Sequence, residues 1–186
     1  SPLAHAAEEL RGDRAVVLAA VRRQGLALAH AAEELRRDRD VALAAVRQAG
    51  LSLQYVAEDL RGDRGVVTAA MRSHPQALRY ASDDVRGDRA FLLPLLLEEG
   101  LLLEHAGEAL RLDREVVAAA VARNVAAFQF AAPELRNSVE FVAYLLRDCQ
   151  ADENVVWFAD ERLKSNADNL VYLMRESGLS LAGRVV

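Results

Sequence analysis

Histidines and carboxylates are the side chains of this 186-residue chain best suited to metal chemistry. His5 and His30 each stand four residues before a carboxylate, Glu9 and Glu34, so each pair could share one face of a helix. The equivalent position in later segments holds other planar rings, namely Tyr55, Tyr80, His105, Phe130 and Phe158. A position that accepts any planar ring indicates packing and not ligation, and no His and Cys cluster has metal-ligand spacing. We therefore expect no metal site and no cofactor.

Adjacent acidic residues also recur, at Glu8-Glu9, Glu33-Glu34, Glu58-Asp59 and Asp83-Asp84. Paired carboxylates can act as acid and base when their surroundings separate their pKa values. Adjacent helical residues point about 100° apart, however, and a catalytic pair has no reason to recur at a fixed interval. We expect the acids to form ion pairs with arginines, either within a segment at Arg11, Arg36, Arg61 and Arg86 or between segments at Arg14, Arg39, Arg64 and Arg89.

The sequence contains no recognisable nucleophile site. Cys149 is the only cysteine, no catalytic motif accompanies it, and no phosphate-binding glycine loop or G-x-S-x-G segment occurs. We expect a protein that is not an enzyme, with a small enzyme of unrecognised site as a second alternative. A lone cysteine forms no internal disulfide, which favours a reducing intracellular compartment over secretion.

The sequence repeats itself with a period of 25 residues. The motif Leu-Arg-Gly-Asp-Arg, or a close variant of it, begins at Leu10, Leu35, Leu60, Val85 and Leu110, with weaker copies at Leu135 and Leu163. Three inserted residues near 151–153 precede the last copy. Self-similarity at a fixed period is typical of solenoid proteins.

Each copy has the pattern of two short helices. Apolar residues fall at positions 3, 6, 7 and 10 and again at 16, 17, 20 and 21 of each repeat, which are helical stripes. The third copy shows both stripes, at Leu53, Val56, Ala57 and Leu60 and at Val66, Val67, Ala70 and Met71. The predicted fold is all-α: an α-solenoid of about seven short helix-turn-helix repeats in a single domain, residues 1–186. The repeats are 1–25, 26–50, 51–75, 76–100, 101–125, 126–153 with the insertion, and 154–178, and 179–186 begins a truncated repeat.

The turn inside each repeat has helix-capping residues. Gly12, Gly62 and Gly87 suit a left-handed residue that ends the first helix. The next position suits the N-cap of the second helix in every copy, and holds Asp13, Asp38, Asp63, Asp88, Asp113, Ser138 and Asn166. Gly25, Gly50, Gly100 and Gly178 are expected to end the second helix.

The block Gly25–Gly50, GLALAHAAEELRRDRDVALAAVRQAG, resembles the DUF4116 repeat family, whose tandem units read approximately G-x-A-L-x-x-A-S-x-E-L-R-x-D-x-x-V-V-x-x-A-V. The resemblance is close over residues 1–125. Over residues 126–178 the apolar and capping positions remain, but much of the polar pattern is lost. The family has no assigned activity, so the resemblance implies tandem helical repeats and no particular chemistry.

Composition and charge narrow the classes of partner. The longest apolar stretch, residues 90–103, is interrupted by Pro94 and by Glu98 to Gly100, so we expect a soluble chain without a membrane span. Arginines at positions 11, 14 and 22 could follow phosphates, which makes an RNA-binding repeat protein the first alternative. Residues 1–100 carry 14 basic and 15 acidic side chains, however, and residues 101–186 carry 9 and 13. A protein partner, in a scaffold or subunit of a larger assembly, is the favoured interpretation.

Departures from the repeat are the candidate protein-binding residues. Position 4 varies and includes Arg79 and Trp157, the only tryptophan, which either is exposed for binding or turns inward after the insertion. Leu97, Leu102 and Leu112 replace residues of other types and could form an apolar patch. Local repacking around Pro94, which we expect to kink its helix, is the alternative explanation for these leucines.

Overall fold

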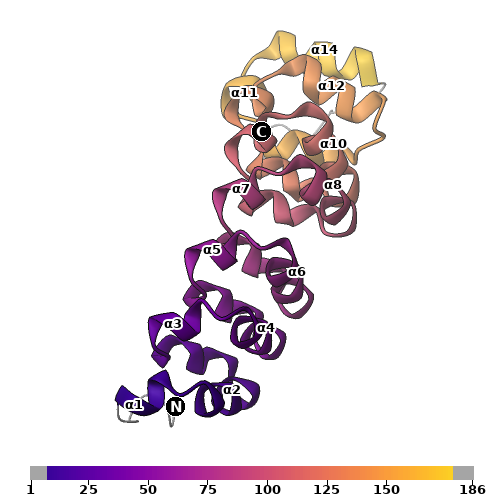
Figure 1. The fold of residues 1–186 in the computed structure, drawn as a ribbon. Coiled ribbons are helices and arrows are strands. Elements are labelled where there is room, and N and C mark those ends of the chain that lie inside the picture. Colours follow the sequence, from indigo (N-terminus) through magenta and orange to yellow (C-terminus); the bar gives the residue numbers. More distant parts are fainter. Residues whose placement is uncertain (1–7, 178–186) are drawn as a thin grey trace. The chain divides into compact units, whose positions relative to one another are not determined.

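The computed structural model describes residues 8–177. Ala4, His5, Gly178 and the predicted truncated repeat at 179–186 lie outside this range. The described residues form α-helices and 3₁₀-helices and no strand (Figure 1). The chain divides into two compact units, an N-terminal unit (Ser1–Arg86) and a C-terminal unit (Gly87–Val186).

Each complete repeat contains a 3₁₀-helix, a short α-helix and a long α-helix. The N-terminal unit contains α1 (Glu8–Gly12), α2 (Arg14–Arg23), η2 (Gly25–His30), α3 (Glu33–Arg36), α4 (Arg39–Gln48), η3 (Gly50–Tyr55), α5 (Glu58–Arg61), α6 (Arg64–Ser73), η4 (Pro75–Tyr80) and α7 (Asp83–Arg86). The C-terminal unit contains α8 (Arg89–Glu98), η5 (Gly100–His105), α9 (Glu108–Leu112), α10 (Arg114–Arg123), η6 (Val125–Phe130), α11 (Pro133–Arg136), α12 (Val139–Arg147), η7 (Glu153–Phe158), α13 (Glu161–Lys164) and α14 (Ala167–Ser177).

The prediction of one continuous first helix in each repeat is wrong. In the second repeat the 3₁₀-helix η2 ends at His30, Ala31 and Ala32 are extended, and α3 begins at Glu33. The extended backbone frees the N–H of Ala32, which donates to the carbonyl oxygen of Arg11 in the preceding repeat at 2.9 Å. The same bond recurs within each unit, from Ala57 to Arg36, from Ser82 to Arg61, from Ala132 to Arg111 and from Asp160 to Arg136. The break therefore supplies a backbone bond between neighbouring repeats.

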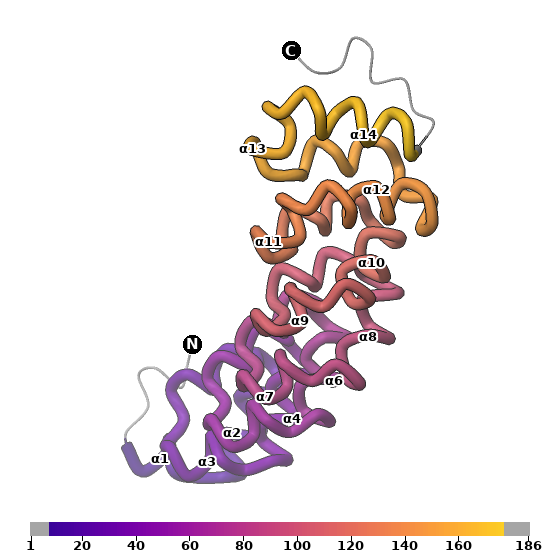
Figure 2. Tube along the Cα trace, turned by 90° about the horizontal axis from the view of Figure 1, so that it is seen from above, coloured from indigo at the N-terminus to yellow at the C-terminus, as the bar shows by residue number. Residues whose placement is uncertain are grey.

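The long helices supply much of the core. Val41, Ala42, Ala45 and Val46 of α4 are fully buried, as the helical stripe predicts. In the N-terminal unit α2, α4 and α6 lie side by side along one edge, and the short helices α1, α3 and α5 lie along the opposite edge (Figure 1). In the C-terminal unit α8 packs on α10, and α12 packs on α14 (Figure 2).

Neighbouring long helices run parallel within each unit. At the N-terminal ends of α2 and α4, Arg14 Nε donates to Asp38 at 2.6 Å. At their C-terminal ends, the N–H of Gly25 donates to Gln48 Oε1 at 2.5 Å. Equivalent residues of successive repeats therefore lie next to each other.

Glycine at the end of a long helix permits close approach of the next repeat. A Cβ atom added to Gly50 would overlap the carbonyl oxygen of Ala70, and one added to Gly25 or Gly100 would meet the equivalent carbonyl of Ala45 or Ala120. The expectation of left-handed turn glycines is wrong for Gly12 and Gly62. Gly12 is the last residue of α1, and Gly62 has φ −89° in the right-handed region, as does the equivalent Arg37 with φ −92°, so the turn needs no positive φ.

Two irregularities distinguish the C-terminal unit. The inserted segment lies between α12 and η7, and its Gln150 has a left-handed φ of 50°. Pro94 lies inside α8, which keeps the ten-residue length of α2, α4, α6 and α10.

Alanine substitution at Gly50 and, for comparison, at Gly62 tests the close approach. Gly50→Ala places a methyl group against the Ala70 carbonyl, so we expect a loss of about 1–3 kcal/mol in the free energy of unfolding. Gly62→Ala meets ordinary contacts in right-handed backbone and should be neutral or stabilising by up to about 1 kcal/mol. Urea denaturation followed by circular dichroism compares the two variants, and equal stabilities would contradict the close approach.

Candidate functional site

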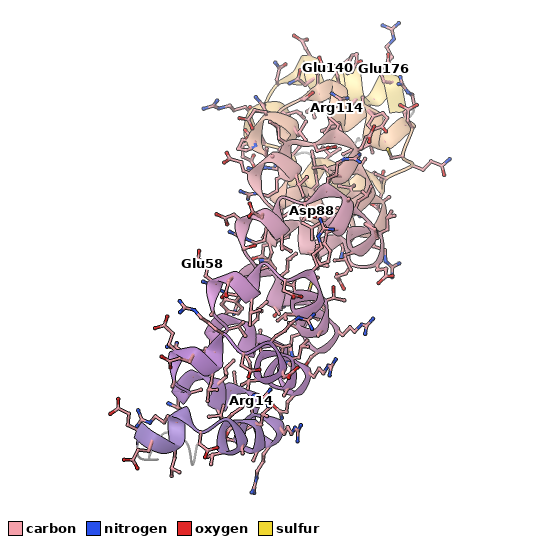
Figure 3. All side chains as sticks on the ribbon, viewed as in Figure 1. Arg14, Glu58, Asp88, Arg114, Glu140 and Glu176 are labelled. Carbon is pink, nitrogen blue, oxygen red and sulfur yellow. The ribbon has the colours of Figure 1, made fainter. Side chains whose placement is uncertain are left out.

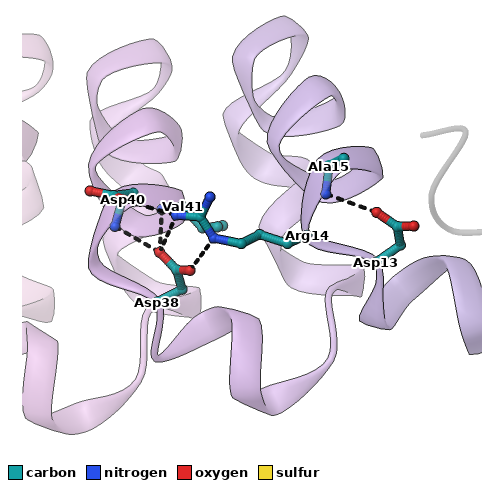
Figure 4. Close-up of polar contacts among 6 residues, drawn as sticks. All are labelled: Asp13, Arg14, Ala15, Asp38, Asp40 and Val41. Carbon is teal, nitrogen blue, oxygen red and sulfur yellow. Dashed lines mark hydrogen bonds and ion pairs between the residues drawn. The ribbon is translucent and has the colours of Figure 1, made fainter.

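The predicted cap residues accept hydrogen bonds from the first turn of the following long helix. Asp38 Oδ1 accepts from the N–H groups of Asp40 and Val41 at 2.9 and 3.1 Å (Figure 4). The remaining predicted caps, Asp13, Asp63, Asp88, Asp113, Ser138 and Asn166, also accept from one or two backbone N–H groups two or three residues further on. These bonds satisfy backbone donors that the first turn of a helix leaves unpaired.

Several caps also bind an arginine of the preceding repeat. Arg14 reaches from α2 to Asp38 and also contacts Asp40 at 2.8 Å (Figure 4). Arg39 Nε contacts Asp63 at 2.9 Å. In the C-terminal unit Arg89 Nε contacts Asp113 at 3.1 Å, and Arg89 also pairs with Glu115. Arg14, Arg39 and Arg89 thus each pair with the next cap, and the expectation that these three arginines pair with the adjacent acids at positions 8 and 9 is wrong.

The caps explain two lowered pKa values. The hydrogen bond from Arg14 is the largest influence that lowers the pKa of Asp38 below its ordinary value, against a smaller opposing effect of burial. The hydrogen bond from Arg39 has the same effect on the pKa of Asp63, and the N–H of Val66 adds to it. Both interactions favour the charged carboxylate.

In the sixth repeat the cap is a serine, and the arginine of the preceding repeat contacts aromatic rings instead of the cap. The sixth cap is Ser138, which cannot form an ion pair. Arg114, at the equivalent of Arg14, lies over the rings of Phe141 and Tyr144 at 4.8 and 5.8 Å from the ring centroids. A cation–π contact therefore replaces the ion pair in this repeat.

Exposed carboxylates line the short-helix edge of the N-terminal unit. We call this the acidic ridge; it comprises Glu8, Glu9, Glu33, Glu34, Glu58, Asp59, Asp83 and Asp84, all exposed. Glu58 lies at the outer side of α5 (Figure 3). Arg86 pairs with Asp83, and Arg37 pairs with Glu33 at 2.9 Å. Within residues 8–177 the predicted ion pair inside a repeat forms at Arg86 through its Nη2 atom, but not at Arg36 or Arg61. The Nε atoms of Arg36, Arg61, Arg86 and Arg111 are buried without a hydrogen-bond partner among the described residues.

A second row of arginines lies at the C-terminal ends of the long helices. Arg22, Arg47 and Arg72 occupy the last turns of α2, α4 and α6, and all three are exposed. Among the described residues, no side chain or backbone group forms an ion pair or hydrogen bond with the guanidinium group of any of them. We call these three residues the arginine row. A cation in the last turn of a helix interacts favourably with the helix macrodipole.

Two shallow grooves run between the long helices beside the arginine row. Each has a volume of about 610 Å³. The groove between α2 and α4 is lined by Arg14, Leu18, Arg22, Asp40, Leu43, Ala44, Arg47 and Gln48. The groove between α4 and α6 is lined by Arg47, Arg64, Gly65, Thr68, Ala69, Arg72 and Ser73. Each groove therefore has two members of the arginine row and one uncharged polar residue, Gln48 or Ser73, at the same end.

Arginine at position 22 in three consecutive repeats occurs only in the N-terminal unit. In the C-terminal unit position 22 holds Leu97, Ala122, Arg147, which pairs with Asp148 and Glu176, and Arg175 in the last turn of α14. Because position 22 of the repeat alignment is arginine in the first three copies, the sequence already contained this signal. The sequence alone could not show at which repeat positions the arginines form ion pairs.

The predicted apolar patch does not form. Leu102 is 5% exposed and belongs to the core, because position 2 of the repeat is buried, as it also is at Ala27 and Ser52. Leu97 and Leu112 are exposed, at 57% and 48%, but Leu97 lies near the C-terminal end of α8 and Leu112 precedes the N-terminus of α10. These helices run parallel, since Arg89 joins their N-terminal ends and Arg123 donates to the Glu98 carbonyl at their C-terminal ends. The two leucines therefore lie about 15 Å apart along the helices.

The variable position 4 is exposed at Gln54, Arg79, Glu104, Gln129 and Trp157 and half-buried at Ala29. Trp157 is 52% exposed, so it does not turn inward after the insertion. Arg79 is exposed and lies over the Tyr80 ring at 4.7 Å. The planar residues of position 5 are half-buried at His30, Tyr55, Tyr80, His105, Phe130 and Phe158.

The described residues contain neither a metal-binding cluster nor a membrane-spanning helix. Residues 8–177 contain no group of three or more His, Cys, Asp or Glu side chains placed to hold a metal ion. Among the helices of that range, none combines the length and the apolar character needed to cross a membrane.

Repeated helices stacked within each unit define an α-solenoid repeat protein. The family described as "Domain of unknown function (DUF4116)" matches residues 13–61, 38–86 and 88–136. These matches together cover more than half of the chain, which therefore belongs to the DUF4116 family. No curated protein and no solved structure matched the chain.

Removal of the arginines that bind the caps should make stability less dependent on pH. Because the pKa values of Asp38 and Asp63 are lowered in the folded state, their ionised forms stabilise the fold above about pH 4, and this is lost as the pH falls through the folded-state values. Arg14→Gln with Arg39→Gln should lower the urea midpoint at neutral pH and change it less in acid. Carboxyl NMR titration should show the pKa of Asp38 rising toward its ordinary value. Arg22→Gln, which removes no ion pair, is the control, and an unchanged Asp38 pKa in the double variant would contradict the assignment.

Proposed function

We propose that this chain is a non-enzymatic scaffold that binds another protein, as a subunit of a larger assembly. The observation that supports it is the arginine row. Arg22, Arg47 and Arg72 are exposed and unpaired among the described residues, while Arg14 and Arg39, one end of the helix away, are held by the caps. The arginine row therefore places three unpaired cations along one edge of adjacent helices, where an external anionic partner can contact them.

The grooves suit a polypeptide surface more than a small substrate. They are shallow spaces between two helices, and their floors are half-buried aliphatic or small side chains such as Leu18, Leu43 and Ala69. A small-molecule site is usually a concave cavity with a few convergent polar groups. An extended surface with the same groups in each repeat is typical of solenoids that bind proteins.

RNA is the second candidate, because the arginine row could also contact phosphates. No aromatic residue lines either groove, whereas recognition of single-stranded RNA commonly stacks bases on aromatic side chains. The N-terminal unit also carries 13 basic and 12 acidic side chains, with eight of the acids in the acidic ridge. This balance favours a protein partner over a polyanion as long as RNA.

Affinity capture from extracts of the source cells tests the proposal with two charge-matched variants. One carries Arg22→Gln, Arg47→Gln and Arg72→Gln. The control carries Arg123→Gln, Arg147→Gln and Arg175→Gln, which are exposed arginines in the last turns of α10, α12 and α14. We expect wild type and control to retain the same proteins in nuclease-treated extract, and the first variant to lose most of them. Capture that nuclease abolishes would instead support RNA binding, and the absence of any protein that distinguishes the two variants would contradict the proposal.

A further inference from the structure

The arginine row and its grooves form one subsite that is repeated. The first copy comprises Arg22, Arg47 and Gln48 at one end of the groove between α2 and α4. The second comprises Arg47, Arg72 and Ser73 at the same end of the groove between α4 and α6. Arg47 belongs to both. A ligand that fits a repeated subsite must itself present the same group at a regular interval.

The spacing of the helices sets that interval. Packed helices lie about 8–10 Å apart, so successive side chains of the arginine row are separated by about that distance. A polyproline II chain has three residues per turn and rises about 3.1 Å per residue, which places every third side chain on one face at about 9 Å. A β-strand places every second side chain on one face, at about 6.6 Å, which is shorter than the spacing of the arginines. An α-helix reaches a similar spacing only at every seventh residue.

Charge defines the group that the ligand presents. The three arginines are unpaired among the described residues, and a guanidinium binds a carboxylate with two parallel hydrogen bonds. Asp40 is the one acidic residue that lines the two grooves, and Arg14 already pairs with it. Carboxylates of a ligand would therefore meet little repulsion at this end.

The neighbouring polar side chains suit an extended backbone. Gln48 Oε1 accepts from the N–H of Gly25, which orients the side-chain amide and leaves its nitrogen without an acceptor among the described residues. Polyproline II backbone has no internal hydrogen bonds, so its carbonyl groups are free to accept from such a donor. An α-helical ligand would have used these carbonyls internally.

We propose that the arginine row binds an acidic peptide segment in the polyproline II conformation, with Asp or Glu at every third residue. This inference rests on the proposed function and adds the chemistry of the partner. The segment crosses the C-terminal ends of α2, α4 and α6, and each arginine of the row binds one carboxylate.

The test measures binding of fluorescein-labelled synthetic peptides to the full chain by fluorescence anisotropy. The first probe has three Glu-Pro-Pro triplets, and the second has the same composition with its three glutamates adjacent. Wild type should bind the spaced probe about tenfold more tightly than the clustered one, because three exposed ion pairs contribute only when each carboxylate can reach its arginine. Binding should weaken as salt is raised to about 150 mM.

The charge-matched variants identify the surface. Arg22→Gln with Arg47→Gln and Arg72→Gln should weaken binding of the spaced probe about tenfold, while the control with Arg123→Gln, Arg147→Gln and Arg175→Gln should change it less than about twofold. Circular dichroism of all three proteins establishes that they are folded alike.

Three results would overturn the inference. These are equal affinity for the spaced and clustered probes, equal losses in the two variants, and tighter binding of a labelled oligouridylate than of the spaced peptide with the same dependence on the arginine row. None of these results would contradict the proposed function, because the capture experiment that tests it uses no designed peptide. If capture fails while the spaced probe binds as described, the peptide site stands and the scaffold role does not.

Discussion

Close approach of successive repeats is the constraint on which the other features depend. The backbone at Gly25 and Gly50 lies against the carbonyl oxygens of Ala45 and Ala70 in the next repeat. These oxygens lie so close that a Cβ atom on either glycine would overlap them. At this separation the extended Ala32 donates its N–H to the preceding repeat. The long helices then run parallel with their ends level, so residues 25 positions apart in sequence become neighbours in space.

This geometry gives chemically identical residues two different roles. At the N-terminal ends of the long helices, a guanidinium meets the cap carboxylate of the next repeat, and Arg14 and Arg39 become part of the structure. At the C-terminal ends the neighbouring side chains are Gln48 and Ser73, which carry no charge, so the arginine row is left for an external ligand. Exposed ion pairs contribute little to stability individually. Their main effect here is to determine which arginines remain available.

Much of the fold follows from the sequence, because capping and core burial depend on local chemistry. Two sequence features are sufficient to place the long helices. These are a side-chain oxygen at every cap position and an apolar stripe such as Val41, Ala42, Ala45 and Val46. The break at Ala31 and Ala32 was not predictable from apolar periodicity, because a continuous helix and a broken one both bury positions 3 and 6 of the repeat. Leu102 was misplaced for a related reason, since the burial of position 2 depends on the 3₁₀ geometry that precedes the break. The partners of the arginines depend on contacts between repeats, which a single sequence does not reveal.

A distance measurement between residues 22 and 72 tests most directly whether equivalent residues form a spatial row. Spin labels at Arg22→Cys and Arg72→Cys, in a chain with Cys149→Ser, can be measured by pulsed electron resonance. Two helix spacings separate these positions, so we expect a single narrow distribution centred at about 20 Å. A broad distribution, or a narrow one at several times that distance, would show that the repeats do not stack with their helices parallel and level.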